Sequence, residues 1–405
     1  MNFLFVHNNF PAQFRFVAEH LAGDARNRVV AIGAAGSREL PGVQLARYFF
    51  DDLGRASVHP FARRFDREAR RAEQVLYVLN SLDNIAFIPD VVVGHSGWGE
   101  TLPLRAKYPN AHFVAYCEYF YRGRGGDVHF DPEFPALGVD GLTHLRAKNA
   151  SQLIALADCD AGLSPTPWQR STYPQEFQGK IAIAHEGVDT IAVRPNPSAT
   201  FRLPTGSMLN AGAEVLTYMA RNLEPMRGIH VFLRALPEVM RRRPNAHVVV
   251  VGGHDVSYGS SSPDGRSWKD VFFSEIESYI DPRRVHFLGV VSYADYLTLL
   301  QVSRVHVYLT YPFTLSWSLI EAMSTGCLII ASDTAPLHDA ITHGQNGLLV
   351  PFFDIDRLAG AISECLSRPE AGLSLRQAAR ATAVNRFDRR QALSAQLRVM
   401  LPARK

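Results

Sequence analysis

The sequence has few of the features that mark several large classes of protein. Cysteine is scarce, because the chain of 405 residues holds only Cys117, Cys159, Cys327 and Cys365. These cysteines are too far apart in sequence to form the close-spaced pairs of a zinc site. Scattered cysteines are typical of reduced thiols in a cytosolic protein, and that is the state we expect here.

An excess of one charge and long apolar runs are also missing. The formal net charge is only +3, which leaves no strongly basic footprint for a nucleic acid. No apolar run approaches the roughly 20 residues that span a bilayer. The N-terminus, MNFLFVHN, lacks the basic start and long apolar core of a signal peptide. We therefore expect a cytoplasmic protein without a nucleic-acid partner.

What the sequence does have is a regular alternation of apolar, β-rich runs with helical segments. In the first half, strands are expected at Phe3–His7, Arg28–Ala34, Asp90–His95 and Ala111–Cys117. In the second half they are expected at Val215–Ala220, Ala246–Val251, Arg284–Leu288, Val305–Leu309, Cys327–Ala331 and Gly347–Val350. This alternation predicts an α/β fold with two doubly wound, Rossmann-like domains.

The predicted domain boundaries follow from a stretch that is rich in proline and polar residues. This stretch, Ile191–Leu209, is predicted to be a linker. We expect one domain at 1–195, a second at 210–385, and a C-terminal helix at 386–405 that packs back toward the first domain. Ligands of doubly wound domains bind beyond the carboxyl ends of the strands, so the site is expected in a cleft between the domains.

Residues 308–331 carry the most information about that site. A helix starts near Ser316, directly after a strand, and its N-terminus suits a diphosphate. Glu321 lies inside this helix, where a carboxylate could accept two hydrogen bonds from a ribose diol. A solvated glutamate is the simpler explanation by position alone, but buried-looking strands at both ends of the helix favour a function.

Two arginines, Arg221 and Arg227, follow the first strand of the second half. Guanidinium groups at a strand end can neutralise a diphosphate, which becomes more negative when it departs as a leaving group. Each arginine alone would be an ordinary surface residue. Together with the Glu321 helix in the same domain, they predict a nucleotide-diphosphate site.

In the first half, two loops after strands are candidates for the cleft. One contains Asn9, Phe10 and Pro11, and the other contains His95 and Gly97. Structural turns explain both loops equally well. A third segment opens at Glu118 and runs to about residue 142, with several aromatic and acidic side chains. A loop of that length is often a binding element.

Two further patterns in the sequence bear on metal binding and on membrane contact. Asp158 with Asp160, and Asp354 with Asp356, have a spacing that can hold a divalent ion. The first pair lies at a helix-to-strand junction and Asp354 reads as a helix N-cap, so we predict no metal site. The basic stretch 63–71 could touch anionic lipid, but a solvated face with internal ion pairs is favoured, and at most peripheral membrane contact is expected.

These residues are similar to a known family. The chain resembles the retaining glycosyltransferases of family 4, which have the GT-B fold of two Rossmann-like domains facing each other across a cleft. The resemblance is most specific at Arg221–Gly228, Val285–Gly289, Pro312–Met323 and Asn346–Val350. It implies transfer of a sugar from a nucleotide-diphosphate donor to an acceptor with retention of configuration, and with neither metal nor other cofactor.

The resemblance also implies roles for individual residues. The matched positions are Arg221 and Arg227 for the diphosphate, Leu315 and Ser316 for backbone donors, Glu321 for the ribose, and Gly252, Gly253 and Leu288 for strand ends that face the nucleotide. Arg221, Arg227 and the helix at Ser316 would assist departure of the leaving group.

Departures from the family pattern concern the sugar. Phe313 replaces the first of two paired glutamates, and Glu118 stands where many members have a histidine. A phenyl ring offers no hydrogen bond to a hydroxyl, so we expect Phe313 to be a packing residue. Backbone N–H groups at Thr314 and Leu315 would then hold the sugar, with His95 or a catalytic Glu118 completing the site.

The sequence therefore predicts a glycosyltransferase with a UDP-sugar as the favoured donor and GDP-mannose as the next. Its acceptor, whether a glycan, a lipid-linked molecule, a protein or a small molecule, is left open. A nucleotide-sugar 2-epimerase of related fold is one alternative. A catalytically silent protein that binds sugar nucleotides is another, and the departures at Phe313 and Glu118 are what favour it.

Overall fold

The computed structural model describes residues 1–51 and 57–401, which form two compact units. The first unit comprises Met1–Gly187 together with the chain from Arg389, and the second comprises Val188–Asp388. The chain thus enters the second unit after Gly187 and leaves it before Arg389. At that passage, Val188 and Asp388 form a β-bridge within the second unit.

The first unit is built on a parallel sheet with the strand order β3-β2-β1-β4-β5-β6-β7. The strands are β1 Asn2–Val6, β2 Arg28–Ala34, β3 Val43–Tyr48, β4 Val91–His95, β5 His112–Tyr116, β6 Ala161–Ser164 and β7 Ile181–Ile183. The order reverses between β1 and β4, so the carboxyl ends of these two strands form the switch point at which such folds bind ligands.

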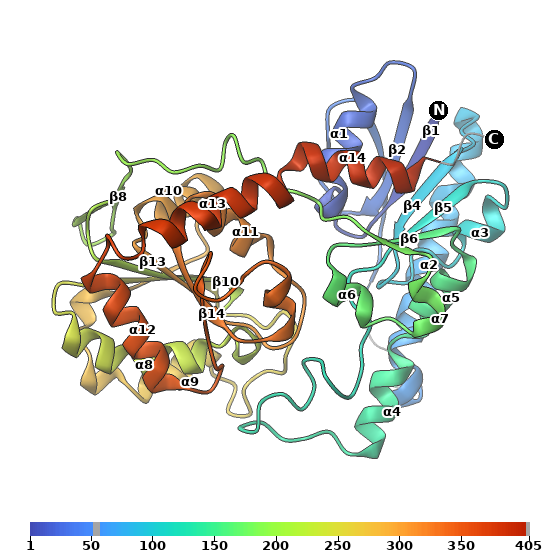
Figure 1. The fold of residues 1–405 in the computed structure, drawn as a ribbon. Coiled ribbons are helices and arrows are strands. Elements are labelled where there is room, and N and C mark those ends of the chain that lie inside the picture. The colour runs from blue at the N-terminus through green and yellow to red at the C-terminus, as the bar shows by residue number, and fades with distance from the viewer. Residues whose placement is uncertain (52–56, 402–405) are drawn as a thin grey trace. The chain divides into compact units, whose positions relative to one another are not determined.

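Both faces of this sheet are buried, because alternate residues of each strand point to opposite sides. In β1, Phe3 and Phe5 belong to one apolar cluster, whereas Leu4 and Val6 belong to another. The helices of this unit are α1 Arg15–Ala22, α2 Arg63–Ser81, α3 Leu104–Lys107, α4 Val139–Ala147, α5 Ala150–Asp158, α6 Pro167–Ser171, α7 Gln175–Gln178 and α14 Arg389–Met400. The last helix, α14, packs against α1 and β6 (Figure 1).

The second unit has a parallel sheet with the order β12-β11-β10-β13-β14-β15 and its switch point between β10 and β13. The strands are β10 Val215–Asn222, β11 His247–Gly253, β12 Val285–Gly289, β13 Val305–Tyr308, β14 Leu328–Ser332 and β15 Leu348–Val350. The helices are α8 Ile229–Arg242, α9 Trp268–Ser274, α10 Tyr293–Val302, α11 Trp317–Ser324, α12 Ile355–Ser367 and α13 Leu373–Phe387 (Figure 1).

One segment differs from its prediction. The stretch Ile191–Leu209, predicted as a linker, contains most of an antiparallel hairpin of β8 Thr200–Arg202 and β9 Met208–Asn210. The hairpin is part of the second unit, because Leu203 and Leu209 are buried in its apolar core. Strands this short, beside prolines, show too little alternation of apolar and polar residues to be predicted from the sequence.

The four cysteines are free and buried, in line with the reduced thiols expected from their spacing. In the described parts of the chain, we find no helix of the length and apolarity that crossing a membrane requires.

Candidate functional site

The second unit places Arg227 at its switch point. This residue ends the turn η4 Pro225–Arg227 that follows β10, and it reaches the residues that follow β13. Its Nη1 donates to Thr310 Oγ1 at 3.0 Å and to Tyr308 Oη at 3.4 Å. Its guanidinium carbon lies 5.5 Å from the ring centre of Tyr258 and 5.8 Å from that of Phe313. Hydroxyls and aromatic rings therefore hold this cation in place.

None of these contacts supplies a negative charge. Among the described residues, no carboxylate forms an ion pair with Arg227. Burial alone would lower the pKa of Arg227, but Tyr308, Tyr258 and Glu224 nearby raise it, so the guanidinium stays charged. A half-buried cation without an anionic partner is a favourable place for an anion from solution. Arg221, the other predicted diphosphate ligand, is exposed near the end of β10.

The glycines at the end of β11 serve the protein's own packing. A Cβ atom on Gly253 would lie 2.3 Å from Asn222 Oδ1, and one on Gly252 would lie 2.7 Å from Leu223 Cδ2. The glycines thus allow the loop that leads to Arg227 to cross the end of β11 closely. Leu288, on neighbouring β12, is half-buried and packs against the apolar core.

The loop between β13 and α11 is tied to Arg227 through one phenol. Ser316 is the N-cap of α11, and its Oγ accepts from the Ser318 N–H at 3.2 Å. The N–H of Ser316, predicted to face the diphosphate, donates to Tyr308 Oη at 3.2 Å. Thr314 and Leu315 lie buried in the same loop. Tyr308 therefore fixes the helix N-terminus and the arginine relative to each other.

Glu321 is held by two tyrosines that the sequence reading missed. Tyr293 Oη donates to one carboxylate oxygen at 2.6 Å, and Tyr296 Oη donates to the other at 2.8 Å. Burial raises the pKa of Glu321, and these two hydrogen bonds act in the opposite direction. Each oxygen keeps a further lone pair, so a diol can still be accepted. The i, i+3 spacing at the start of α10 places both tyrosines on one face of that helix, but it does not identify Glu321 as their partner.

Phe313 is buried, as predicted, and packs against Tyr258 with ring centres 4.9 Å apart. The loop that carries Tyr258 is anchored by Glu224, which is also buried. Glu224 Oε2 accepts from the backbone N–H groups of Ser257, Tyr258 and Gly259 at 3.1 to 3.3 Å. The aromatic wall beside Arg227 thus depends on a carboxylate whose Oε2 is held by backbone donors, whereas its buried Oε1 has no hydrogen-bond partner among the described residues.

The first unit brings polar side chains to the ends of β1, β4 and β5. The N–H of Asn9 donates to His7 Nδ1 at 2.9 Å, and the N–H of Gly97 donates to His95 Nδ1 at 3.0 Å. The rings of His7 and His95 touch edge to face, with centres 5.0 Å apart. His95 Nε2 lies 3.3 Å from Glu118 Oε2. The predicted residues His95, Gly97 and Glu118 therefore meet in one cluster.

Two other predicted residues of this unit have different surroundings. Phe10 is fully buried in the apolar cluster that contains Phe14, and Pro11 follows a cis peptide bond. Gln13, which was not predicted, lies just beyond them and donates to Glu118 Oε1 at 3.1 Å. The turn after β1 thus buries the ring of Phe10 and places the side-chain amide of Gln13 against Glu118.

The basic stretch 63–71 at the start of α2 is only partly solvated, which corrects the prediction of a solvated face. The expected internal pairs exist, because Arg64 pairs with Glu68 and Arg70 pairs with Asp66. Arg64 Nη2 also donates to the carbonyl oxygen of Gly97 at 2.8 Å. Part of this face therefore holds the loop after β4 rather than facing solvent.

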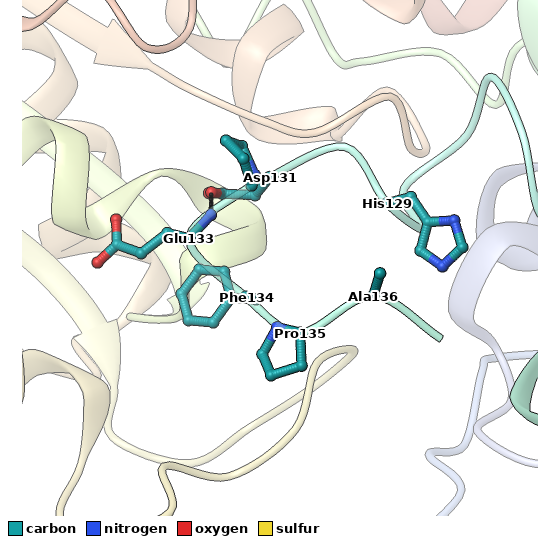
Figure 2. Close-up of a pocket in the computed structure, with 7 residues that line it drawn as sticks. His129, Asp131, Glu133, Phe134, Pro135 and Ala136 are labelled. Atoms are coloured by element: carbon teal, nitrogen blue, oxygen red, sulfur yellow. Dashed lines mark hydrogen bonds between the residues drawn. The ribbon is translucent and has the colours of Figure 1, made fainter. Parts of the chain in front are cut away.

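The long loop from Glu118 forms a small open hollow of its own, about 480 Å³ in volume. It is lined by His129 and by residues 131–136. Figure 2 shows that these residues follow one curve of the chain, with the Glu133 N–H donating to Asp131 Oδ1 at 2.9 Å. The described residues that line this hollow include none of the strand-end cluster of the first unit.

One aspartate of each predicted pair has structural partners. Asp160 precedes β6, at the amino end of the first sheet, and accepts from Arg105 Nη2 at 2.7 Å and from the Phe113 N–H at 2.8 Å. Asp354 is the N-cap of α12 and accepts from the Arg357 N–H at 2.9 Å, so its predicted role as a cap is confirmed.

Two Rossmann-like units with parallel sheets define the GT-B class, and solved structures share this fold. Sucrose-phosphate synthase from Thermosynechococcus elongatus has a TM-score of 0.75 at 18% identity, with 98% of each chain covered. HepE from Anabaena, in complex with UDP and glucose, has a TM-score of 0.67 at 16% identity, with 98% of each chain covered. The predicted fold class is confirmed.

Sequence comparison identifies the family. The family model described as "Glycosyl transferase family 4 group" matches residues 25–193, and the model described as "Glycosyl transferases group 1" matches residues 208–382. The chain belongs to the group 1 glycosyltransferases of family 4.

Curated relatives agree with this assignment. The D-inositol 3-phosphate glycosyltransferase of Mycobacterium leprae is 28% identical over 305 residues, which are 69% of this chain and 66% of the relative. The same enzyme from Rhodococcus erythropolis is 28% identical over 192 residues, which are 47% of this chain and 41% of the relative. The chain therefore spans less than two thirds of the length of these relatives.

Proposed function

We propose that this protein is a retaining glycosyltransferase that moves a sugar from a nucleoside-diphosphate sugar to an acceptor hydroxyl. The observation that carries the proposal is Arg227, a charged and half-buried guanidinium without a carboxylate partner at the switch point of the second sheet. UDP-sugars are the favoured donors and GDP-mannose the next. The UDP complex of the structurally similar HepE supports this order.

The proposed mechanism follows from the place where negative charge develops during sugar transfer. When the bond between the sugar carbon and the diphosphate breaks, its electron pair passes to the diphosphate oxygen. Arg227, assisted by Arg221 and by the N-terminus of α11, stabilises that charge more strongly in the transition state than in the bound donor. The acceptor oxygen then attacks from the face that the diphosphate leaves, which retains the configuration. The proton of the acceptor hydroxyl ends on the departing diphosphate.

We propose that no metal ion takes part, because arginines and a helix dipole supply the positive charge. Transfer should therefore persist in excess EDTA. If EDTA abolishes transfer and magnesium or manganese restores it, this part of the proposal is wrong. The acceptor stays open, and the names of the curated relatives make an inositol phosphate one candidate.

The central experiment is a thermal-shift screen of nucleoside diphosphates and their sugars on the full chain. A ligand at 100 times its dissociation constant should stabilise its unit by about 2.7 kcal/mol. Binding of UDP or GDP by the wild type, weakened in Glu321→Ala, is the expected result. Wild-type affinity in Glu321→Ala would refute the ribose assignment, and absence of any nucleotide binding would refute the function.

An NMR time course with the donor that binds separates the remaining alternatives. A 2-epimerase would interconvert sugar nucleotides without an acceptor. A silent binding protein would leave the donor unconsumed even when a cell extract supplies acceptors. The proposed transferase consumes the donor only when an acceptor or water can receive the sugar.

A further inference from the structure

One of the two aromatic rings beside Arg227 is open to solvent. Tyr258 is 41% exposed, whereas Phe313, the other ring beside the guanidinium, is only 4% exposed. The two rings pack against each other with their centres 4.9 Å apart and their planes at 55°. The ring of Tyr258, rather than that of Phe313, is therefore accessible to a ligand that binds at Arg227.

The loop that carries Tyr258 is fixed to the same backbone segment as Arg227. Glu224 Oε2 accepts from the Tyr258 N–H at 3.2 Å and from the N–H groups on either side of it. Asn222 Nδ2 donates to Ser257 Oγ at 2.7 Å. Asn222 and Glu224 both lie in the short stretch between β10 and Arg227. Because the loop is anchored in advance, the exposed ring loses little conformational freedom when a ligand packs against it.

The chemistry of Tyr258 suits a sugar. Its ring centre lies 5.5 Å from the guanidinium carbon of Arg227, so a group attached to a phosphate bound there is within reach of the ring. The ring offers an apolar surface, and the hydroxyl can both donate and accept a hydrogen bond. A sugar ring has the complementary arrangement, because its faces carry C–H groups and its rim carries hydroxyls.

The proposed ribose site indicates which end of the donor reaches Tyr258. Glu321 lies in α11 and is held by two tyrosines of α10, so the nucleoside is placed beside these two helices. The side chains that contact Arg227 come instead from β13 and from the segments that follow β11 and β13. A diphosphate that binds Arg227 with its ribose at Glu321 therefore directs its other end, which carries the transferred sugar, toward Tyr258. At this step the inference rests on the proposed function.

We propose that Tyr258 is a specificity-determining residue that contacts the transferred sugar of the donor. One C–H face of the sugar packs against the ring, and the phenol forms a hydrogen bond with a hydroxyl on the rim of the sugar. Phe313 cannot make this contact, because its ring is buried and its side chain has no polar atom. Tyr258 thus recognises the sugar, whereas Arg227 binds the diphosphate.

The first test follows the protons of the bound donor by NMR, with the full chain and either UDP-glucose or GDP-mannose. Protons that lie over an aromatic ring shift upfield because of the ring current. We expect the sugar protons to shift upfield with the wild type and with Tyr258→Phe, and to lose this shift with Tyr258→Ala. The proposal is overturned if the sugar shifts persist in Tyr258→Ala, or if the shifts that disappear belong to the base or the ribose.

The second test compares two dissociation constants by calorimetry, that of the nucleotide sugar and that of the matching nucleoside diphosphate. Their ratio cancels any effect of Tyr258 on the grip of Arg227. Tyr258→Ala should raise the ratio by about tenfold, and Tyr258→Phe should raise it less, because only one hydrogen bond is lost. The control is Tyr279→Ala, which removes a tyrosine of the same unit that is 72% exposed and should leave the ratio unchanged. An unchanged ratio in Tyr258→Ala would mean that Tyr258 only covers Phe313.

The wild type decides separately whether the proposed function holds. If neither UDP, GDP nor their sugars bind to it, the proposed function is refuted, and the role of Tyr258 is refuted with it. If a nucleoside diphosphate binds and the ratio is the same in the wild type and in Tyr258→Ala, the nucleotide site stands and only the role of Tyr258 is wrong. Because Tyr258 is exposed, both of its variants should unfold at the temperature of the wild type, which a thermal scan without ligand checks.

Discussion

At the residue scale, the guanidinium of Arg227 is held in a fixed position without an ion-pair partner in direct contact among the described residues, so it can bind an anion. Hydroxyls of Tyr308 and Thr310 orient it, and the rings of Tyr258 and Phe313 flank it. A carboxylate in the same place would orient the arginine equally well but would also neutralise it. The direct partners of Arg227 are uncharged, and only the nearby Glu224 offsets part of its charge, so much of the charge is left for a ligand.

The first prediction compares the two arginines. Arg227→Met should weaken UDP binding by about 2–5 kcal/mol, because it removes a desolvated charged contact. Arg221→Met should cost less, since Arg221 is exposed and its charge is screened by water. Isothermal titration calorimetry measures both affinities. Equal losses in the two variants would show that the burial of Arg227 has no special role.

The second prediction concerns Phe313→Glu, which restores the glutamate of the family pattern. Phe313 lies beside Arg227, so the new carboxylate should pair with the guanidinium and compete with the donor diphosphate. We expect weaker UDP binding and no gain in turnover, with Phe313→Leu as the control for lost packing. A faster rate or a new donor sugar in Phe313→Glu would show that the missing glutamate left a real vacancy.

The third prediction concerns Glu118, which accepts hydrogen bonds from both His95 and Gln13. Glu118→Ala should lower the turnover of donor by about tenfold or more, because a carboxylate in this position can orient a hydroxyl. UDP affinity should stay unchanged, since the nucleotide contacts are proposed for the other unit. Steady-state kinetics and calorimetry on the same preparation check the two parts, and unaltered turnover would remove Glu118 from the site.

At the scale of elements, strands and helices with a strong apolar pattern were predictable. Strands β2 and β10–β15 lie within a few residues of their expected positions, and α11 begins at Trp317, directly after the predicted start near Ser316. Edge strand β3 was missed, because its residues are mostly half-exposed and its apolar pattern is weak. The β8–β9 hairpin was missed because its strands are short and adjoin a proline-rich stretch.

The candidate site was predictable where a residue follows directly from a strand end. Arg227, Glu118 and His95 could be placed because parallel strands end at one edge of a sheet. Contacts between distant elements could not be placed in this way. The hydrogen bonds of Tyr293 and Tyr296 to Glu321, and of Glu224 to the loop at 257–259, depend on tertiary packing that no local spacing encodes.

The loop after β4 supplies a prediction about pH. Glu100 is fully buried and accepts a hydrogen bond from Tyr48, and burial raises its pKa from 4.5 to about 7. Between these two values the folded protein holds a proton that the unfolded chain has released. Glu100 therefore contributes fully to the free energy of unfolding below the pKa of the unfolded chain, and this contribution is lost as the pH rises through about 7. The loss of free energy is on the order of 3 kcal/mol.

Glu100→Gln should remove that dependence and flatten the loss of stability between pH 4.5 and about pH 7. Urea unfolding can be followed in the first unit by fluorescence of Trp98 and Trp168, once Trp268 and Trp317 of the second unit have been replaced by phenylalanine. The wild type with the same replacements is the control. A slope that persists in Glu100→Gln would mean that another group titrates.

At the scale of the whole molecule, charge and surface argue against stable association with lipid. The net charge is +3, and Arg64 and Arg70 of the basic stretch are half-buried in ion pairs. We expect the protein to stay in the supernatant with anionic vesicles at physiological salt. Cosedimentation that disappears on replacing Arg63, Arg64 and Arg67 would instead indicate a lipid-linked acceptor.

The bridge between Val188 and Asp388 means that the second unit is a continuous insertion with adjacent ends. The flanking residues of the first unit are neighbours as well, because a Cβ atom on Gly187 would lie 2.4 Å from the Cα of Arg389. Excision of residues 188–388 would thus leave a gap that a short turn can close. We expect each unit to fold when it is expressed alone, so that the nucleotide binding proposed for the second unit can be measured without the first.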